Sequence, residues 1–371
     1  MYFDWIVLSL TLPDLWQHLQ RQLCPALTED VGPLSRLDEQ FVQTISLTDL
    51  GPFLRRYAWI GNGCPPHARV WLIHAFLAKS VYQFPTTAAL LDALNSRPTL
   101  RQLCGWESVG DIPSESTFSR AFAAFADDAV PQQIHQQMVC THAGPKLVGH
   151  VSRDATAIVA PERPAPKPAP APVAPRKRGR PRAGETRPPA PPKRLELQPQ
   201  RTLAENLADL PTVCNVGCKR NSQGHQESWI GYKLHLDTID GDIPVSSILT
   251  SASVHDSQVA IPLAQMSAGR VTWLYDLMDS AYDAPQIHAF SRAHGHVPII
   301  DPNPRRGEKI PLAPAQAQRY RERSAAERVN SRLKERYGGR WVRVRGARKV
   351  MAHLMFGVIA LTAQALWARL C

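Results

Sequence analysis

Residues Tyr320–Lys334 have the sequence YRERSAAERVNSRLK, with the spacing of an amphipathic helix. At about 100° per residue, Tyr320, Arg323 and Lys334 fall within roughly 40° of Glu327. The opposite side carries small and apolar residues, namely Ala325, Ala326, Val329 and Leu333. One face is therefore suited to packing, and the other presents one carboxylate among groups that bind phosphate.

Two interpretations of this stretch are open. Arg323 and Glu327 are either an ordinary i,i+4 pair on a solvated helix, or part of a site for metal-assisted chemistry on a nucleic-acid backbone. Two further acids favour the second interpretation. Asp154 lies in the strand-like run VSRDATAIVA, and Asp279 closes the apolar run VTWLYDLMD. Each of them could instead cap a turn, but a carboxylate at the end of a buried strand points into the crevice where α/β sheets bind ligands.

The composition favours a polyanionic partner. The chain has 371 residues, of which 44% are hydrophobic, and Lys plus Arg outnumber Asp plus Glu by 43 to 32. A basic surplus of this kind is typical of proteins that bind nucleic acid. The seven scattered cysteines indicate reduced thiols in the cytoplasm. We expect no membrane-spanning run and no signal peptide.

Helical spacing of apolar residues predicts an all-α domain over residues 1–145. Within it, the segment 112–126 has Phe118, Phe122 and Phe125 on one face and polar residues in its first turns. This segment is either the recognition helix of a helix-turn-helix motif or part of a plain helical bundle whose phenylalanines form the core. The sequence leaves both open.

Residues 146–371 predict an α/β domain with mixed strands. The run 228–251 has two β-branched stretches joined by IDGD, which predicts a hairpin. A segment at about 160–205 is dominated by Pro, Ala, Arg and Lys, and we expect it to be a disordered insertion. Within it, Arg178 and Arg180 of RKRGRPR look like an AT-hook for the minor groove; the alternative is a basic linker that binds DNA by charge alone.

Tyr320, Arg323, Glu327 and Lys334 match the signature Y-x2-R-x3-E-x6-K. The stretches NSQGHQESWIGYKLHLD and MDSAYDAP look like the segments that accompany this signature in the same family. With these motifs the chain resembles bacterial insertion-sequence transposases with a DDE catalytic domain. The resemblance implies a ribonuclease-H-like fold for the α/β domain. It also implies that two Mg²⁺ (or Mn²⁺) ions are bound by three catalytic acids, Asp154, Asp279 and Glu327.

The resemblance further implies cleavage of DNA at the element ends and joining of the 3′-OH to target DNA. Tyr320, Arg323 and Lys334 would contact phosphates near the terminal inverted repeats, in a homodimer or higher oligomer on DNA in the bacterial nucleoid. Two other functions stay open: a metal-dependent endonuclease without strand transfer, and an inactive DNA-binding relic or repressor. The 48 residues from Asp279 to Glu327 are too few for the β-rich insertion that supports a hairpin route in some members.

Overall fold

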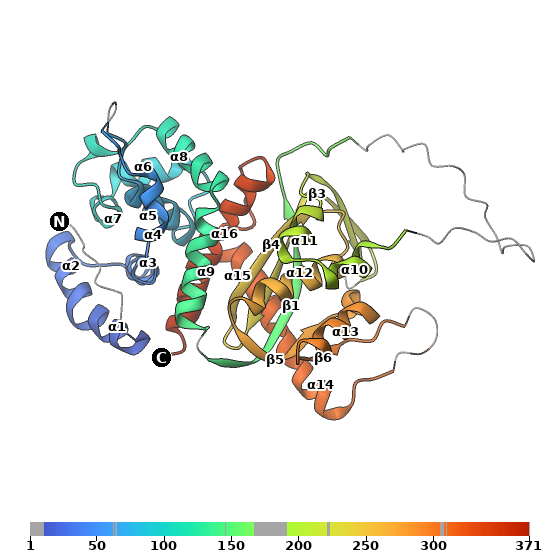
Figure 1. The fold of residues 1–371 in the computed structure, drawn as a ribbon. Coiled ribbons are helices and arrows are strands. Elements are labelled where there is room, and N and C mark those ends of the chain that lie inside the picture. Colours follow the sequence, from blue (N-terminus) through green and yellow to red (C-terminus); the bar gives the residue numbers. More distant parts are fainter. Residues whose placement is uncertain are drawn as a thin grey trace, which may run out of the picture.

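The computed structural model describes residues 11–370 apart from 62, 64, 145, 167–190, 221, 222, 305–307 and 309. A group of helices and a mixed α/β unit lie side by side, with the long helix α16 (Ala347–Trp367) between them (Figure 1). The predicted order of a helical region followed by an α/β region matches this arrangement. The two arginines of the predicted AT-hook, Arg178 and Arg180, lie outside the described residues.

The N-terminal part is helical because its apolar residues repeat with helical spacing and its helices have local stop and start signals. Thr86 caps α6, since its Oγ1 accepts a hydrogen bond from the Ala89 amide at 3.0 Å. Gly105 ends α7 in the left-handed conformation, with a φ of 114°. The helices are α1 (Leu12–His18), α2 (Cys24–Val31), α3 (Arg36–Ser46), α4 (Gly51–Leu54), α5 (Arg69–Val81), α6 (Thr87–Ser96), α7 (Pro98–Cys104), α8 (Glu115–Asp127) and α9 (Val130–His142).

The phenylalanine face of α8 belongs to the core. Phe118 and Phe125 are fully buried, and the ring of Phe122 lies 5.1 Å from that of Phe76 of α5. Phe76 in turn lies 5.5 Å from Phe356 of α16. The phenylalanines therefore form part of the core of a helical bundle. DNA contact by the exposed polar face of α8 stays a prediction.

The α/β unit is built on a mixed sheet. Its strands are β1 (Leu147–Val159), β2 (Asn215–Arg220), β3 (Gln226–Ile239), β4 (Ile243–Ser251), β5 (Thr272–Met278) and β6 (Val297–Ile300). The order is β2-β3-β1-β5-β6, with β4 also paired to β3. β3 runs antiparallel to β1, β2 and β4, whereas β1, β5 and β6 are parallel. This mixed α/β arrangement is compatible with a ribonuclease-H-like fold.

The predicted hairpin is confirmed as β3 and β4. Its turn contains Gly241 and Asp242 with φ of 78° and 59°, the left-handed conformation that a tight hairpin turn needs. β2 was not predicted from the sequence. It pairs antiparallel with the first half of β3, the next strand along the chain.

Helices cover both faces of the sheet. α12 (Ser257–Ala268) packs on β3 and β4, and α15 (Ser324–Arg336) packs across β1 and β3 on the other face, next to α16. The remaining helices are α10 (Arg194–Leu197), α11 (Leu203–Asp209), α13 (Pro285–Ala293) and α14 (Pro314–Tyr320). Short 3₁₀ turns (Gln198–Gln200, Ser280–Tyr282 and Arg321–Arg323) adjoin several of them.

Two sequence predictions are corrected here. The single helix predicted over 320–334 is divided into α14 and α15 by the 3₁₀ turn Arg321–Arg323. This turn contacts β1, where the Ser152 hydroxyl donates to the Glu322 carbonyl at 3.3 Å, so tertiary contact overrides the helical pattern. The apolar run before Asp279 was interpreted as a buried strand, but Leu274 near the start of this strand, β5, is 45% exposed.

The predicted disordered insertion, at about 160–205, is also too long at its C-terminal end. Residues from 191 onward are described, and α10 and α11 pack against α12. Thr202 caps α11 by accepting from the Glu205 amide, and the buried Asn206 donates to the Gln198 carbonyl at 3.1 Å. Local capping and these buried polar contacts give the segment an ordered structure despite its composition.

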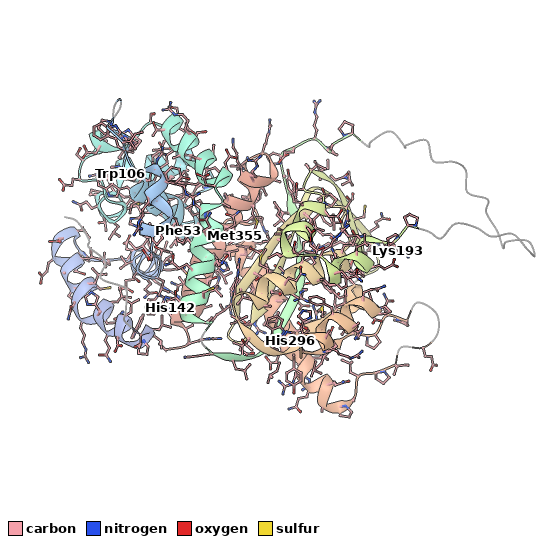
Figure 2. All side chains as sticks on the ribbon, in the orientation of Figure 1. Phe53, Trp106, His142, Lys193, His296 and Met355 are labelled. Carbon is pink, nitrogen blue, oxygen red and sulfur yellow. The ribbon has the colours of Figure 1, made fainter. Side chains whose placement is uncertain are left out.

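α16 packs against both parts of the molecule. It packs against α3, α5, α8 and α9 on one side and against β4 and α15 on the other. Figure 2 shows Met355 at this junction, and the Ser247 hydroxyl of β4 lies 3.0 Å from the Met355 sulfur. Contrary to our expectation, this 21-residue helix has the length and hydropathy of a membrane span. Its apolar window is 83% buried in the protein, so it serves as a core helix.

A buried ion pair supplies a first prediction. Arg153 and Asp237 form two hydrogen bonds of 2.8 Å, with side chains that are 2% and 0% exposed. We expect Asp237→Ala to lower the free energy of unfolding by about 3–5 kcal/mol, because it leaves a buried guanidinium without its main partner. Arg348→Ala breaks an exposed pair with Asp127 and should cost less than about 1 kcal/mol. Urea unfolding of both variants checks this, and equal losses would contradict it.

Buried histidines supply a second prediction. Burial lowers the pKa of His74, His235 and His353 to about 4 and that of His135 to about 3. Since the unfolded pKa is about 6.5, stability is fully present above that pH and is lost as the pH falls toward 4. Each histidine should contribute about 1.4 kcal/mol per pH unit. Urea unfolding between pH 7.5 and 4.5 measures the slope, and His235→Gln should reduce it by one proton.

Candidate active site

The pairing of three parallel strands stops at one level, although β1 itself continues to Val159, and an aspartate follows that level on each of the three. Arg153 of β1 pairs in register with Met278 of β5, and Met278 with Ile300 of β6. The next residues along these strands are Asp154, Asp279 and Asp301. The carboxyl ends of parallel strands are where α/β sheets bind ligands.

The alternation of side chains sends Asp154 and Arg153 to opposite faces of the sheet. Arg153 points to the α12 face, where Ser267 of α12 donates to its partner Asp237 at 2.7 Å. Asp154 lies on the α15 face, where the Asn330 side-chain amide donates to its Oδ2 at 3.0 Å. This hydrogen bond holds α15 against the part of β1 that carries Asp154.

Glu327 lies one helical turn before Asn330 on the same helix. Positions three residues apart share a face of a helix, so Glu327 belongs to the side of α15 that meets β1. Its carboxylate forms a salt bridge with Arg323, and its side chain is 56% exposed. Glu327 is therefore the most accessible of the three predicted catalytic acids.

Arg323 is the cation that lies among the three acids. Its side chain is 18% exposed and its guanidinium also lies 5.7 Å from the centre of the Tyr320 ring. Burial by itself would lower the pKa of Arg323, but its neighbours outweigh burial and raise the pKa. These neighbours are Tyr320, Glu327, Asp154 and Asp279.

The aspartates of this edge repel one another. Burial, followed by the charge of Asp279, raises the pKa of Asp154 to about 6. The pKa of Asp279 is also raised, first by burial and then by Asp256 and Asp301, although its Oδ1 accepts from the Ala281 amide at 2.9 Å. A site whose carboxylates raise one another's pKa holds more negative charge than Arg323 neutralises.

The structure brings Asp154 and Asp279 together and holds Glu327 nearby through Arg323. The side chains are not arranged as a complete metal site: among the described residues, no group of three His, Cys, Asp or Glu side chains is placed to hold an ion. The donors nevertheless suit a hard divalent cation, since they are carboxylate oxygens with surplus charge. The buried Tyr282 hydroxyl, which has no hydrogen-bond partner among the described residues, adds an unsatisfied oxygen whose pKa is raised by burial and then by Asp256, Asp154 and Asp279.

The sequence analysis missed three residues of this site, Asp256, Asp301 and Tyr282, whereas helical spacing already places Asn330 on the side of Glu327. A signal existed for Asp301, which follows the strand-like run VPII directly, as Asp279 follows its own strand. Asp256 is the N-cap residue of α12, but its side chain makes no capping hydrogen bond and instead pairs with Lys233 at 2.8 Å. No local signal marks Tyr282, because its role depends on which elements pack together.

The predicted phosphate contacts surround the site. Tyr320 ends α14 and is partly buried, which raises its pKa to about 12. Next to it, the guanidinium of Arg319 lies 3.9 Å from the centre of the Tyr275 ring. Lys334 lies seven residues beyond Glu327 on α15 and is half-buried. At about 1.5 Å per residue, the distance along the helix is about 10 Å.

Two family models match the chain. The model described as Transposase DDE domain matches residues 212–363, which include Asp279 and Glu327 but not Asp154. The model described as Transposase domain (DUF772) matches residues 27–124 in the helical part. No curated protein and no solved structure matched the chain. DDE domains generally use divalent metals, and the two matches together support an insertion-sequence transposase of the DDE type, a class of protein that acts on DNA.

Proposed function

We propose that this protein cuts the ends of a DNA element and joins the freed 3′-OH to target DNA by two-metal-ion phosphoryl transfer. The proposal rests on one observation above all: the parallel pairing of β1 with β5 stops at Arg153 and Met278, Asp154 and Asp279 are the next residues, and α15 carries Glu327 on the side that meets β1. It is supported by the surplus of negative charge at this edge, which a pair of divalent cations would neutralise.

Asp154, Asp279 and Glu327 are the proposed ligands of two Mg²⁺ or Mn²⁺ ions. When bound, such ions activate the attacking oxygen and stabilise the leaving oxygen of an in-line displacement. The chain's own groups do the rest. Asn330 orients the Asp154 carboxylate, and the guanidinium of Arg323 is placed to bind a phosphate with its planar fork once Glu327 turns to the metals.

Substitution of the acids tests this assignment. We expect Asp154→Asn, Asp279→Asn and Glu327→Gln each to reduce Mg²⁺-dependent cleavage to background while DNA binding stays largely intact, because each removes a ligand and its charge. The assay is cleavage of a plasmid that carries the gene with its flanking DNA. Glu335→Gln, on the same helix but paired with Arg340, is the matched control and should retain cleavage. Strong cleavage by any of the three variants would refute the role of that residue.

A strand-joining assay with the wild-type protein distinguishes the alternative functions. Pre-cut ends with a free 3′-OH, incubated with a target plasmid and Mg²⁺, should be joined by a transposase but not by an endonuclease without strand transfer. An inactive relic or repressor would bind the ends and neither cut nor join them. The pair of neighbouring buried aspartates favours an active enzyme, because their pKa shifts show that both are held at a cost in stability.

Lys334 is the proposed contact to a phosphate near the element end. No salt bridge of the described residues includes it, and removal of one phosphate contact lowers the salt slope of DNA binding by about one. We therefore expect Lys334→Ala to weaken binding and to reduce that slope, measured by fluorescence anisotropy at several salt concentrations. Arg292→Ala, an exposed cation of α13, is the control; an unchanged slope for Lys334→Ala would remove this residue from the interface.

Further DNA contacts and assembly are also part of the proposal. Tyr320 adjoins Arg323 at the start of the same surface. Arg178 and Arg180 are proposed to bind A·T-rich minor grooves or to add charge alone. A homodimer or higher oligomer on the DNA would bring two element ends together.

A further inference from the structure

The residues that connect α15 to α16 form an extended arm over the surface, which we define as residues 337–346. Its side chains alternate. Val342 is buried in the core and Val344 is partly buried against it, whereas Arg343 and Arg345 are exposed. Trp341 is 61% exposed, although it is one of the largest apolar side chains. The valines hold the arm in place and leave an aromatic ring and two cations facing outward.

Both ends of the arm are fixed by hydrogen bonds. The Gly339 amide donates to the Leu333 carbonyl of α15 at 2.9 Å. At the other end the Gly346 amide donates to the Glu162 carboxylate at 2.8 Å, and Tyr232 donates to the same carboxylate at 3.0 Å. The exposed side chains therefore project from a backbone that is already ordered, which reduces the entropy lost when they bind.

The arm and its surroundings are strongly cationic. The salt bridges of the described residues include neither Arg343 nor Arg345. Burial, followed by repulsion from Lys219 and Arg340, lowers the pKa of Lys334 at the start of the arm. A surface with unpaired cations and mutual repulsion favours a polyanion.

The arm passes between two hollows. The first has a volume of about 350 Å³ and is lined by Lys334, Arg340, Trp341 and Phe84 among others. The second, of about 1100 Å³, is a wide groove that Arg345 shares with the end of β1 and the start of β3; its other lining residues include Arg163, Trp229 and Glu162. Aromatic rings and cations thus recur along one path. The two acids that line the hollows already have partners, since Glu335 pairs with Arg340 and Glu162 accepts from Gly346 and Tyr232.

We propose that the arm binds a single-stranded stretch of DNA, with Trp341 stacking on an unpaired base and Arg343 and Arg345 contacting phosphates. The proposal rests on the proposed function for the identity of the nucleic acid. Sites for single strands combine a cationic groove with aromatic side chains on which bases stack. A duplex, by contrast, is bound without sequence preference through its phosphates, and the bases stacked inside it offer no free face to a tryptophan.

The position of the arm relates it to the catalytic edge. Lys334 borders the first hollow and lies about 10 Å beyond Glu327 along α15. A strand that leaves the cleavage site along this helix therefore meets Lys334 and then Trp341. The arm is thus placed to hold DNA that is unpaired within a few nucleotides of the cut.

Binding measurements without metal test the arm. Full-length wild-type and variant proteins are titrated, in EDTA, into a fluorescent twelve-nucleotide oligothymidylate and into a twelve-base-pair duplex. Trp341→Ala should weaken binding of the single strand by roughly 5- to 150-fold, the range for loss of one base stack, and change duplex binding less than twofold. Trp341→Phe should retain most of the affinity. Arg343→Ala with Arg345→Ala should reduce the salt slope for the single strand by up to about 1.4, roughly 0.7 for each phosphate contact, and Arg292→Ala should not.

An equal loss on both DNAs, or no loss on the single strand, would overturn the proposal. Since Trp341 is mostly exposed, its removal should leave the thermal melt unchanged, and the melt is recorded for each variant. The outcome is independent of the chemistry, because no metal is present. If the binding results contradict the arm but Mg²⁺-dependent cleavage is observed, the proposed function is unaffected. If the wild type does not cleave, the binding measurements still test the arm.

Discussion

The parallel pairing of β1 with β5 is the constraint on which the rest of the molecule depends. It fixes which face each side chain of β1 occupies, so that Arg153 enters the core under α12 and Asp154 faces α15. A slip of one residue would exchange the two faces. Arg153 would then lie at the candidate site, and Asp154 would lie against the buried carboxylate of Asp237.

The candidate site balances charge differently from the core beneath it. In the core, Arg153 is matched by Asp237 in a bidentate pair. At the candidate site, burial and then the charge of Asp279 raise the pKa of Asp154, and Arg323 is shared with the exposed Glu327. The paired charges of Arg153 and Asp237 offset each other, whereas the unbalanced acids at the candidate site reduce stability. This division is expected where function and stability compete.

α16 links the candidate site to the helical part. It packs on the N-terminal helices through Phe356 and on the sheet through Met355, and the hydrophobic core continues through it without a break. The predicted domain boundary near residue 145 stays a prediction, because one hydrophobic core includes residues from both sides of it. The arm starts at the end of α15 and leads into α16, so contacts made there act on an element shared by both parts.

The sequence by itself determined the features that depend on local periodicity. These are the N-terminal helices, the β3–β4 hairpin, the apolar strand before Asp279 and the amphipathic character of α15, because spacing, caps and turn residues act within a few positions. Only the tertiary structure decided that Asp301 joins Asp154 and Asp279, that a 3₁₀ turn precedes α15, and that Arg323 lies among the acids. Those features arise from strand register and from contacts between residues far apart in the chain, which no local pattern encodes.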